Sequence, residues 1–339
     1  MFELCNHIEC APRMARHDRT RRSSTDRRGR SLAMLVSLAV LSGLAIPGCD
    51  RGGQAVSAAK PTDAERAERI VALLPFAADH LIEMGVTPAA VPRLDGEEPE
   101  SWQGIPTVAL DHSAGPNLEQ LIAADPDLIV TSSEYAQFIP AMERSTGSEA
   151  LVMDVDSVAI VPEHIRTLGE LAGRPQRASK LVERIERHTR PASPESPVST
   201  LAIFGTPHAF YAFLPDSYLG DLVSLAGGEL ITDDMQSHGV FRGLAPLSME
   251  TVVDRDPEQL IVVFHGPEQT ARAMIDRDPL WSGLRAVRED RVAFLRDDLY
   301  AMRPGSELPR AINQIKRIIA QARLARETSG TTETRKAQR

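Results

Sequence analysis

The sequence predicts an α/β protein with two similar lobes, and a repeated pattern is the main reason. Residues 116–130 and 248–262 share this pattern, in which a cap residue stands two positions before a glutamate. An Asp-Pro pair ends seven positions after that glutamate, and an aliphatic run follows. A helix–strand unit that occurs twice indicates two α/β lobes, and two lobes imply a ligand-binding cleft between them.

Each copy of the pattern predicts a capped helix followed by a buried strand. Asn117 and Ser248 can accept hydrogen bonds from the free N–H groups at a helix start. We expect Asp-Pro to end each helix, because the residue before proline avoids the helical region. Leu128–Val130 and Leu260–Val263 show no polar alternation, which is typical of strands in a parallel sheet covered on both faces.

The other segments extend the likeness between the lobes. A strand at Arg69–Leu74 and a helix ending at Gly85 open the first lobe, and a strand at Thr200–Gly205 and a helix at Tyr218–Ala226 open the second. Further expected elements are a loop at 94–104, strands at 105–110, 151–155 and 291–295, and helices at 135–144, 162–172, 176–189 and 308–326.

The N-terminus has the composition of a secretory signal. Residues 13–30 hold eight arginines, and an apolar stretch of sixteen residues, 31–46, follows them. That stretch is shorter than the roughly 20 residues of a membrane span. Gly48-Cys49 resembles a bacterial lipobox, so we expect cleavage before Cys49 and lipid attachment to its sulfur. An ordinary signal peptide or an uncleaved anchor is the alternative, and either Sec or twin-arginine export would serve.

Charge and cysteine content exclude several classes of protein. The net charge of −9 argues against nucleic-acid binding, which needs a basic surface. Cys5 and Cys10 would leave with the signal and Cys49 would be acylated, so no disulfide is expected. The sequence has no G-x-S-x-G elbow, no Walker loop and no G-x-G-x-x-G after a strand, and we therefore expect no enzyme.

The order and spacing of these pieces resemble the class III periplasmic substrate-binding proteins, also called helical-backbone metal receptors. These proteins serve ABC importers of vitamin B12, ferric siderophores and haem. The matching pieces are Ile70–Pro75, Pro116–Glu119, Asp125–Ile129, Leu225–Gly228, Pro246–Glu250 and Asp278–Trp281 with Arg291–Phe294. The resemblance implies two Rossmann-like lobes with parallel sheets, joined by one long rigid helix.

The resemblance also implies a division of the chain and a set of partners. The expected divisions are a lipoprotein signal peptide at 1–48, a tether at 49–67, an N-terminal lobe at 68–160, a connecting helical segment at 161–192, a C-terminal lobe at 198–326 and a disordered tail at 327–339. The protein would be a monomer in the periplasm or at the cell surface, held to the membrane by the lipid on Cys49. Its partners would be an ABC permease with its ATPase and a metal chelate carried as cargo, with no intrinsic cofactor.

Positions just after the parallel strands, with nearby loops, are expected to line the cleft, because open α/β sheets bind ligands at the carboxyl ends of their strands. The candidates are Trp102, His112, Tyr135, Tyr218, His238, His265, Tyr300 and Arg303. Aromatic faces would grip a planar macrocycle, and a guanidinium would pair with an anionic chelate or propionate. The alternative is that these aromatic residues pack in the core and that the arginine is a surface residue.

Histidines offer a second kind of site. His112, His238 and His265 with a carboxylate would suit a divalent transition-metal ion, although their spacing is not that of a metal motif. Receptors for haem in the resembled family usually have a tyrosine in the segment before the first repeat helix. That segment is Ala109–His112 here and has none, so His112 would have to replace it.

Two glutamates have a separate expected role. The resemblance implies that one acid on each lobe docks on arginines of the permease, and Glu119 and Glu250 occupy the matching positions. Glu134 is an alternative for the first lobe, and a favourable interaction with the helix dipole is the simpler explanation. Three functions therefore stay open: a receptor for an iron chelate or corrinoid, a receptor for a histidine-ligated metal ion, and a metal chelatase.

Overall fold

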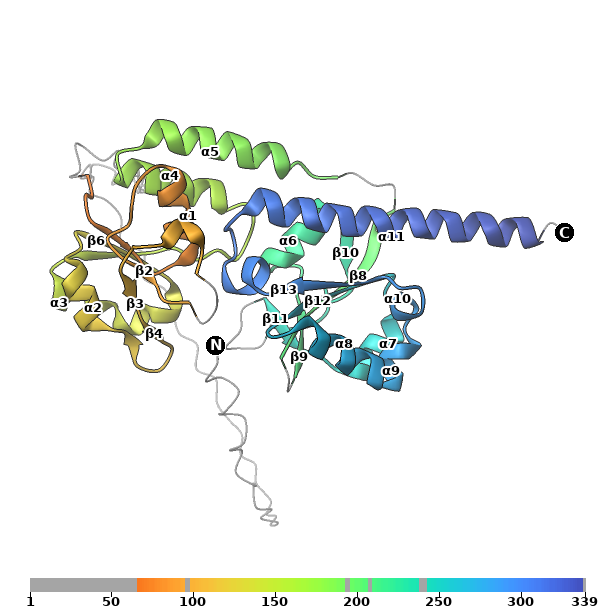
Figure 1. The fold of residues 1–339 in the computed structure, drawn as a ribbon. Coiled ribbons are helices and arrows are strands. Elements are labelled where there is room, and N and C mark those ends of the chain that lie inside the picture. Colours follow the sequence, from red (N-terminus) through yellow and green to blue (C-terminus); the bar gives the residue numbers. More distant parts are fainter. Residues whose placement is uncertain (1–65, 95–97, 193–195, 207–208, 238–242, 338–339) are drawn as a thin grey trace, which may run out of the picture. The chain divides into compact units, whose positions relative to one another are not determined.

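A computed structural model describes residues 66–337 apart from 95–97, 193–195, 207–208 and 238–242. Residues 64–339 form one compact unit (Figure 1). The expected signal peptide, Cys49, nearly all of the tether, and His238 lie outside the described residues. Within the described part, no helix combines the length and the apolar character that a membrane crossing requires.

The N-terminal lobe is a parallel sheet with strand order β1-β6-β7. A parallel bridge from Val71 to Ala90 extends this sheet towards a second parallel pair, β2 and β3. The elements are β1 (Ile70–Ala72), α1 (Pro75–Glu83), β2 (Val91–Pro92), η2 (Glu100–Trp102), β3 (Thr107–Val108), β4 (Leu110–Asp111), β5 (Gly115–Pro116), α2 (Leu118–Ala124), β6 (Leu128–Thr131), η3 (Ser133–Phe138), α3 (Ile139–Thr146) and β7 (Glu149–Val152).

Two helices, α4 (Val161–Leu171) and α5 (Pro175–His188), connect the lobes. The apolar side of α5 is buried, as its 3.6-residue period predicts. Its C-terminus is held by the second lobe, because Lys316 Nζ donates to the carbonyls of His188 at 2.7 Å and Arg190 at 3.0 Å. A cation at the end of a helix also compensates the helix dipole.

The C-terminal lobe has a six-stranded sheet in which the path β11-β9-β8-β12-β13 is completed by β10, which pairs with β8. Strand β9 pairs antiparallel with both of its neighbours, β8 and β11. The pairs β8–β10, β8–β12 and β12–β13 are parallel. The elements are β8 (Val198–Gly205), β9 (Phe210–Phe213), α6 (Tyr218–Leu225), β10 (Gly228–Leu230), β11 (Leu244–Pro246), α7 (Met249–Arg255), β12 (Gln259–Phe264), α8 (Glu268–Arg277), α9 (Pro279–Gly283), α10 (Arg285–Arg288), β13 (Val292–Arg296), η4 (Asp298–Met302) and α11 (Leu308–Ala337).

The predicted repeat is present in both lobes. Helix α2 leads into β6 and α7 leads into β12, and each of these strands lies beside the first strand of its own lobe in parallel register. Ile70 pairs with Leu128 in the first lobe, and Leu201 pairs with Leu260 in the second. Pro126 and Pro257 therefore precede equivalent strands, and the fold is the α/β class expected.

The two repeat helices end at the expected Asp-Pro pairs, but the aspartate conformation rather than the proline accounts for where they stop. Asp125 and Asp256 stop the helices by adopting left-handed conformations with φ of 48° and 35°, which end a helix in the way that glycine usually does. At the start of the helices, the Asn117 side chain accepts from the Gln120 N–H at 3.0 Å, but the Ser248 side chain caps nothing.

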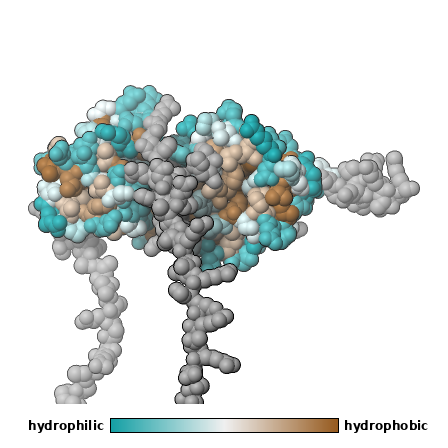
Figure 2. Space-filling view, turned by 90° about the horizontal axis from the view of Figure 1, so that it is seen from below, coloured by the Kyte–Doolittle hydropathy of each residue, from teal (hydrophilic) through white to brown (hydrophobic). Residues whose placement is uncertain are grey.

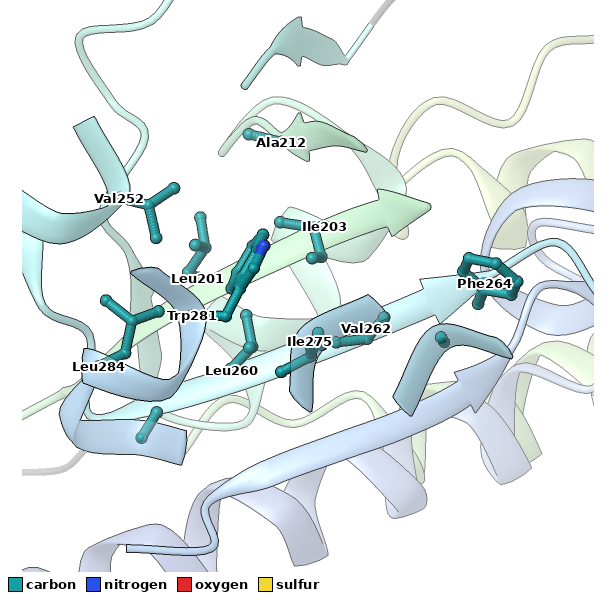
Figure 3. Packing of buried hydrophobic residues seen from close by; sticks show 12 residues of the cluster. Leu201, Ile203, Ala212, Val252, Leu260, Val262, Phe264, Ile275, Trp281 and Leu284 are labelled. Atoms are coloured by element: carbon teal, nitrogen blue, oxygen red, sulfur yellow. The ribbon is translucent and has the colours of Figure 1, made fainter. Parts of the chain in front are cut away.

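The core of the C-terminal lobe is built around Trp281, which is 2% exposed. Leu201, Ile203, Leu260 and Leu284 surround its ring (Figure 3), and Phe210 meets it edge to face at 5.4 Å between centroids. The Asp278 side chain caps α9, the helix that carries Trp281, by accepting from the Leu280 N–H at 2.9 Å.

Helix α11 closes the chain and is longer than its apolar period predicts. It continues past Arg326 through the segment expected to be a disordered tail, as far as Ala337. The Thr328 hydroxyl donates to the carbonyl of Ala325, three residues earlier, at 2.8 Å.

Candidate ligand-binding site

The first group of candidate residues lies where β6 ends in the N-terminal lobe. His112, in the turn between β4 and β5, stacks on Tyr135 of η3 with ring planes 13° apart and centroids 6.1 Å apart. Its Nδ1 lies 3.8 Å from Glu134 Oε1, and its side chain is one third exposed. Tyr135 is only 5% exposed and also contacts Phe138, so it supports the His112 ring from the core side.

The second group lies at the matching edge of the C-terminal lobe. His265 follows β12 and Asp297 follows β13, and the register that pairs Phe264 with Arg296 brings them together. His265 Nδ1 is hydrogen-bonded to Asp297 Oδ2, and both side chains are partly exposed. A carboxylate on one ring nitrogen fixes the orientation of an imidazole, as it does behind metal-bound histidines.

The third group joins the two lobes and is buried. Asp79 of α1 accepts from Trp102 Nε1 at 2.9 Å through one oxygen and from Arg303 NH2 at 2.7 Å through the other. The Arg303 guanidinium also lies 5.9 Å from the Trp102 ring centre. Arg303 follows η4 in the second lobe, whereas Asp79 and Trp102 belong to the first. Because the Asp79 and Arg303 side chains are only 12% and 10% exposed, this is a well-shielded ion pair between lobes.

Gly305 provides a close contact beside that ion pair. Its φ is 85°, and a Cβ there would lie 2.7 Å from the Phe76 ring, so only glycine fits. Its carbonyl oxygen lies 3.2 Å from His80 Nε2 in α1. Tyr218 is buried next to the Gly305 backbone, and burial raises the pKa of its hydroxyl well above the ordinary value. The hydroxyl is therefore neutral at physiological pH.

Tyr300 is anchored within the second lobe. Its hydroxyl donates to Gln314 Oε1 of α11 at 2.8 Å, and its ring is 3% exposed. Burial, followed by the negative charge of Asp298, raises the pKa of Tyr300. Its ring packs with η4 and α11, so a ligand would reach Tyr300 only after a local rearrangement.

The structure thus places the eight candidates in several different settings. It brings Trp102 and Arg303 together, stacks His112 on Tyr135, pairs His265 with a carboxylate and buries Tyr218 and Tyr300; His238 lies outside the described residues. Among the described residues, no group of three or more histidine, cysteine or acidic side chains is arranged to hold a metal ion. The three-histidine site, which needs His238, stays a prediction.

Three carboxylates were missed from the sequence. Asp297 comes directly after a strand, so the rule that selected His265 could have found it. Asp79 is an acid within the otherwise apolar start of α1, a pattern that indicates a buried partner. Glu134 was considered only for docking; it is exposed, as Glu119 and Glu250 are, and its Oε1 lies 3.8 Å from His112 Nδ1.

Two α/β lobes, with polar and aromatic side chains at the carboxyl edges of their sheets, define a class of binding protein rather than one particular ligand. Residues 70–299 match the family model described as periplasmic binding protein, and the chain belongs to this family.

Named relatives share the fold at low identity. Staphylococcus aureus IsdE, a high-affinity heme uptake system protein, is 19% identical in an alignment of 226 residues that covers 64% of this chain and 75% of IsdE. The structure of IsdE complexed with heme has a TM-score of 0.62 at 18% identity and covers 74% of this chain and 98% of IsdE. The siderophore-binding protein FeuA of Bacillus subtilis, complexed with ferri-bacillibactin, has a TM-score of 0.60 at 16% identity and covers 75% of this chain and 92% of FeuA. The vitamin B12 binding protein BtuF of Vibrio cholerae has a TM-score of 0.59 at 19% identity and covers 76% of this chain and 98% of BtuF.

Proposed function

We propose that this protein is the substrate-binding lipoprotein of an ABC importer, which captures an iron chelate or a corrinoid and delivers it to the permease. The observation that carries the proposal is the duplicated lobe in a family member whose structural neighbours are named with heme, a ferric siderophore and vitamin B12. All three of those ligands are large metal chelates, and a cleft between two lobes would suit a ligand of that size.

Histidines at the strand ends are the first contacts that we assign to the ligand. His112 and His265 each lie at the carboxyl edge of one lobe, are partly exposed and face a carboxylate. Tyr135 and Asp297 would hold these two rings in place. Trp102, Tyr218, Tyr300 and Arg303, which are buried, would shape and support the site, and Arg303 would reach an anionic group only if it left Asp79.

The remaining parts of the proposal concern location and delivery. The lipid on Cys49 would anchor the protein in the periplasm or at the cell surface. Glu119 and Glu250 would meet basic residues of the permease, because each is exposed at the second position of a repeat helix. The protein would act as a monomer with one permease and its ATPase.

A thermal-shift panel on protein that begins at Asp50 tests the proposal. The four probes are haem, a ferric tris-catecholate siderophore, cobalamin and a divalent transition-metal ion. A ligand at 100 times its dissociation constant stabilises a protein by about 2.7 kcal/mol, which is easily detected. The proposal fails if the melting temperature responds to none of the three chelates.

Alanine variants then locate the site. His112→Ala and His265→Ala should each weaken chelate binding about tenfold, which corresponds to about 1.4 kcal/mol. His188→Ala is the matched control, because His188 lies at the end of α5, away from the strand ends, and its side chain is hydrogen-bonded to the Arg184 carbonyl at 2.8 Å. Wild-type affinity in both strand-end variants would move the site elsewhere.

A receptor for a metal ion is the second candidate, and the His265–Asp297 pair favours it. A carboxylate behind an imidazole is the usual support of a metal-bound histidine. In this case the metal ion alone would raise the melting temperature, and His265→Ala would remove the shift. Cobalamin and the siderophore would have no effect.

A further inference from the structure

Acidic side chains dominate the sheet edges where the ligand site is proposed. The carboxyl ends of parallel strands meet at one edge of a sheet, and open α/β sheets bind ligands there. Within three positions after the end of a parallel strand, the described acidic and basic residues, histidine aside, are one arginine, Arg93, and six acids. The six acids are Asp111, Glu134, Asp154, Asp233, Asp297 and Asp298. None of the six is buried, so their charges can act on a ligand.

The amino edges of the same sheets provide an internal comparison. Acids occur there as well, but arginines lie against them. Arg69 Nε lies 3.7 Å from Asp125 Oδ2 at the start of β6. Arg285 and Arg326 lie 3.9 Å and 3.4 Å from the carboxylate of Glu258, which precedes β12. A guanidinium is always charged, so the acids at the amino edges are balanced where they stand.

The acids at the carboxyl edges have weaker countercharges. Glu134 and Asp297 each lie against a histidine. Unlike a guanidinium, an imidazole does not carry a permanent positive charge. Asp154 accepts a hydrogen bond from a backbone N–H, which is an uncharged donor. Arg296 lies 3.7 Å from Asp298 and so balances one of the six acids. The carboxyl edges therefore keep more uncompensated negative charge than the amino edges do.

The buried arginine between the lobes does not compensate for these acids. Arg303 NH2 donates to Asp79 Oδ2 at 2.7 Å, and the pair has no net charge. Trp102 Nε1 donates to the other oxygen of Asp79 at 2.9 Å, so the carboxylate is held on both sides. An anionic ligand that took Arg303 away would leave a well-shielded carboxylate without its countercharge, which is unfavourable.

The rest of the surface gives an anion little additional attraction. Figure 2 shows mainly hydrophilic surface on the visible face of both lobes, with smaller hydrophobic patches. In the whole chain 47 acidic residues outnumber 38 basic ones, and the net charge is −9. The summed field of such a chain opposes the approach of an anion, and repulsion of the wrong ligand is a common source of specificity.

We propose that the cargo is a metal chelate without net negative charge, and that the acids at the carboxyl edges of the two sheets exclude anionic chelates. The inference rests on the proposed function and narrows it to one charge class. A corrinoid with amide side chains and a ferric trihydroxamate belong to this class. Haem with two free propionates and a ferric tris-catecholate do not belong to it.

Three pairs of probes, similar in scaffold and different in charge, test the inference. The pairs are cobalamin with a corrinoid whose side-chain amides are hydrolysed to carboxylates, a ferric trihydroxamate with a ferric tris-catecholate, and the dimethyl ester of haem with haem. Dissociation constants are measured on protein expressed from the full chain. In every pair that binds, we expect the anionic member to bind about tenfold or more weakly than its partner, because like charges oppose its binding.

Isosteric amide variants separate the edge acids from the net charge of the chain. Glu134→Gln with Asp154→Asn removes two charges from the carboxyl edge and keeps the oxygen that accepts the Ser133 N–H. Glu68→Gln with Glu149→Gln is the matched control, because it removes the same charge from exposed positions at the amino edge of the same sheet. The preference against the anionic member should fall by about threefold or more in the first variant and stay within about twofold in the control.

Failure of the inference and failure of the proposed function give different results. An anionic probe that binds as tightly as its partner, or more tightly, would overturn the inference and leave the proposed function intact. Equal falls in the two double variants would also overturn it, because net charge alone would then set the preference. Binding to none of the six probes would end the proposed function and the inference together. Circular dichroism of each variant shows whether it folds, and the comparison of probe pairs on the wild-type protein does not depend on the variants.

Discussion

The two lobes close the same helix-to-strand junction with different residues at different depths. In the N-terminal lobe Asp127 is exposed and accepts from the N–H groups of Glu68 at 2.7 Å and Arg69 at 3.1 Å. In the C-terminal lobe Glu258 is 13% exposed and accepts from the Ser199 N–H at 3.1 Å. Glu258 also faces two arginines, whereas no cation faces Asp127 among the described ion pairs.

The two lobes also use different arginines to bind the last carbonyls of the repeat helix. The Arg69 side chain donates to the carbonyls of Ala124 and Asp125, both at 2.6 Å, and so caps the end of α2 from the strand side. The end of α7 is held instead by Arg285 of α10, whose side chain reaches the Asp256 carbonyl at 3.1 Å. The backbone geometry is therefore common to both lobes, and the side chains that secure it depend on how much water reaches each junction.

The largest effect should come from the core of the C-terminal lobe. Trp281→Ala should lower the free energy of unfolding by about 3–5 kcal/mol, because it removes a fully buried ring and leaves a cavity. We expect one transition in urea followed by both circular dichroism and fluorescence, since the Asp79–Arg303 ion pair and the Lys316 contacts join the lobes. Two separate transitions would show that the lobes unfold independently.

Substitution of the two acids at the helix-to-strand junctions, Glu258 and Asp127, should give the next largest changes in the free energy of unfolding. Glu258→Ala should cost about 2 kcal/mol, because it leaves the partly buried Ser199 N–H and two partly buried arginines without their carboxylate. Asp127→Ala should cost under about 1 kcal/mol, because water replaces the carboxylate at an exposed site. Urea titration of both variants gives the comparison. Equal losses of stability in the two variants would show that the burial of Glu258 and the exposure of Asp127 do not distinguish the two junctions.

The helix N-caps should give smaller effects, and again we expect a loss of stability in only one lobe. Asn117→Ala should cost about 1 kcal/mol, because the Asn117 side chain accepts the Gln120 N–H. Ser248→Ala should change the free energy of unfolding by no more than about 0.3 kcal/mol, because the Ser248 side chain caps nothing. A loss at Ser248 as large as that at Asn117 would mean that the serine caps α7 in solution.

The smallest expected effects are opposite in sign and depend on pH. Burial raises the pKa of Glu83 in α1, but the hydrogen bond and charge of His80, with Arg184, outweigh burial and hold the pKa below its ordinary value. Burial, with a smaller contribution from Asp156, raises the pKa of Asp221 in α6 despite its hydrogen bond from the Val158 N–H.

These shifts determine how each variant should respond to pH. A lowered folded-state pKa stabilises the protein above the unfolded value, and that contribution is lost as pH falls through the folded-state value. Glu83→Gln should therefore be less stable than wild type at pH 7, and the difference should shrink as pH falls. A raised pKa acts in the other direction, so Asp221→Asn should be no less stable than wild type at pH 7. Urea midpoints of both variants and wild type, measured from pH 7 to about pH 3, test these signs. A Glu83→Gln protein as stable as wild type at pH 7, or a less stable Asp221→Asn protein, would contradict them.

Local pattern predicted the parts of the fold that local residues determine. The repeat helices, the central strands β6 and β12 and the connecting helix α5 follow from caps, Asp-Pro pairs and apolar periodicity. The expected strand at 105–110 is divided between β3 and β4, and the expected helix at 135–144 is divided between η3 and α3, where Pro140 stands at the start of the second helix. Strands β9, β10 and β11 were missed, because pairing across a sheet leaves little trace in one short segment.

The candidate site was harder to predict for a related reason. Strand ends correctly indicate where His265 and Tyr135 lie along the fold, but they do not reveal what a side chain contacts. Asp79 and Arg303 are separated by 224 positions in the chain, and only the packing of two lobes brings them together. Trp102, Tyr218 and Tyr300 are buried, and the position of a residue near a strand end does not predict that burial.

The self-contained junctions also bear on the history of the chain. Asp127 reaches back to the start of β1, and Glu258 reaches the start of β8 and two arginines of its own lobe, so each half carries its own closure. After a duplication, a substitution in one half needs no matching change in the other. Arg69 could therefore serve one copy and Arg285 the other, and the two halves could lose nearly all sequence likeness while a left-handed aspartate, a proline and an acid kept their order.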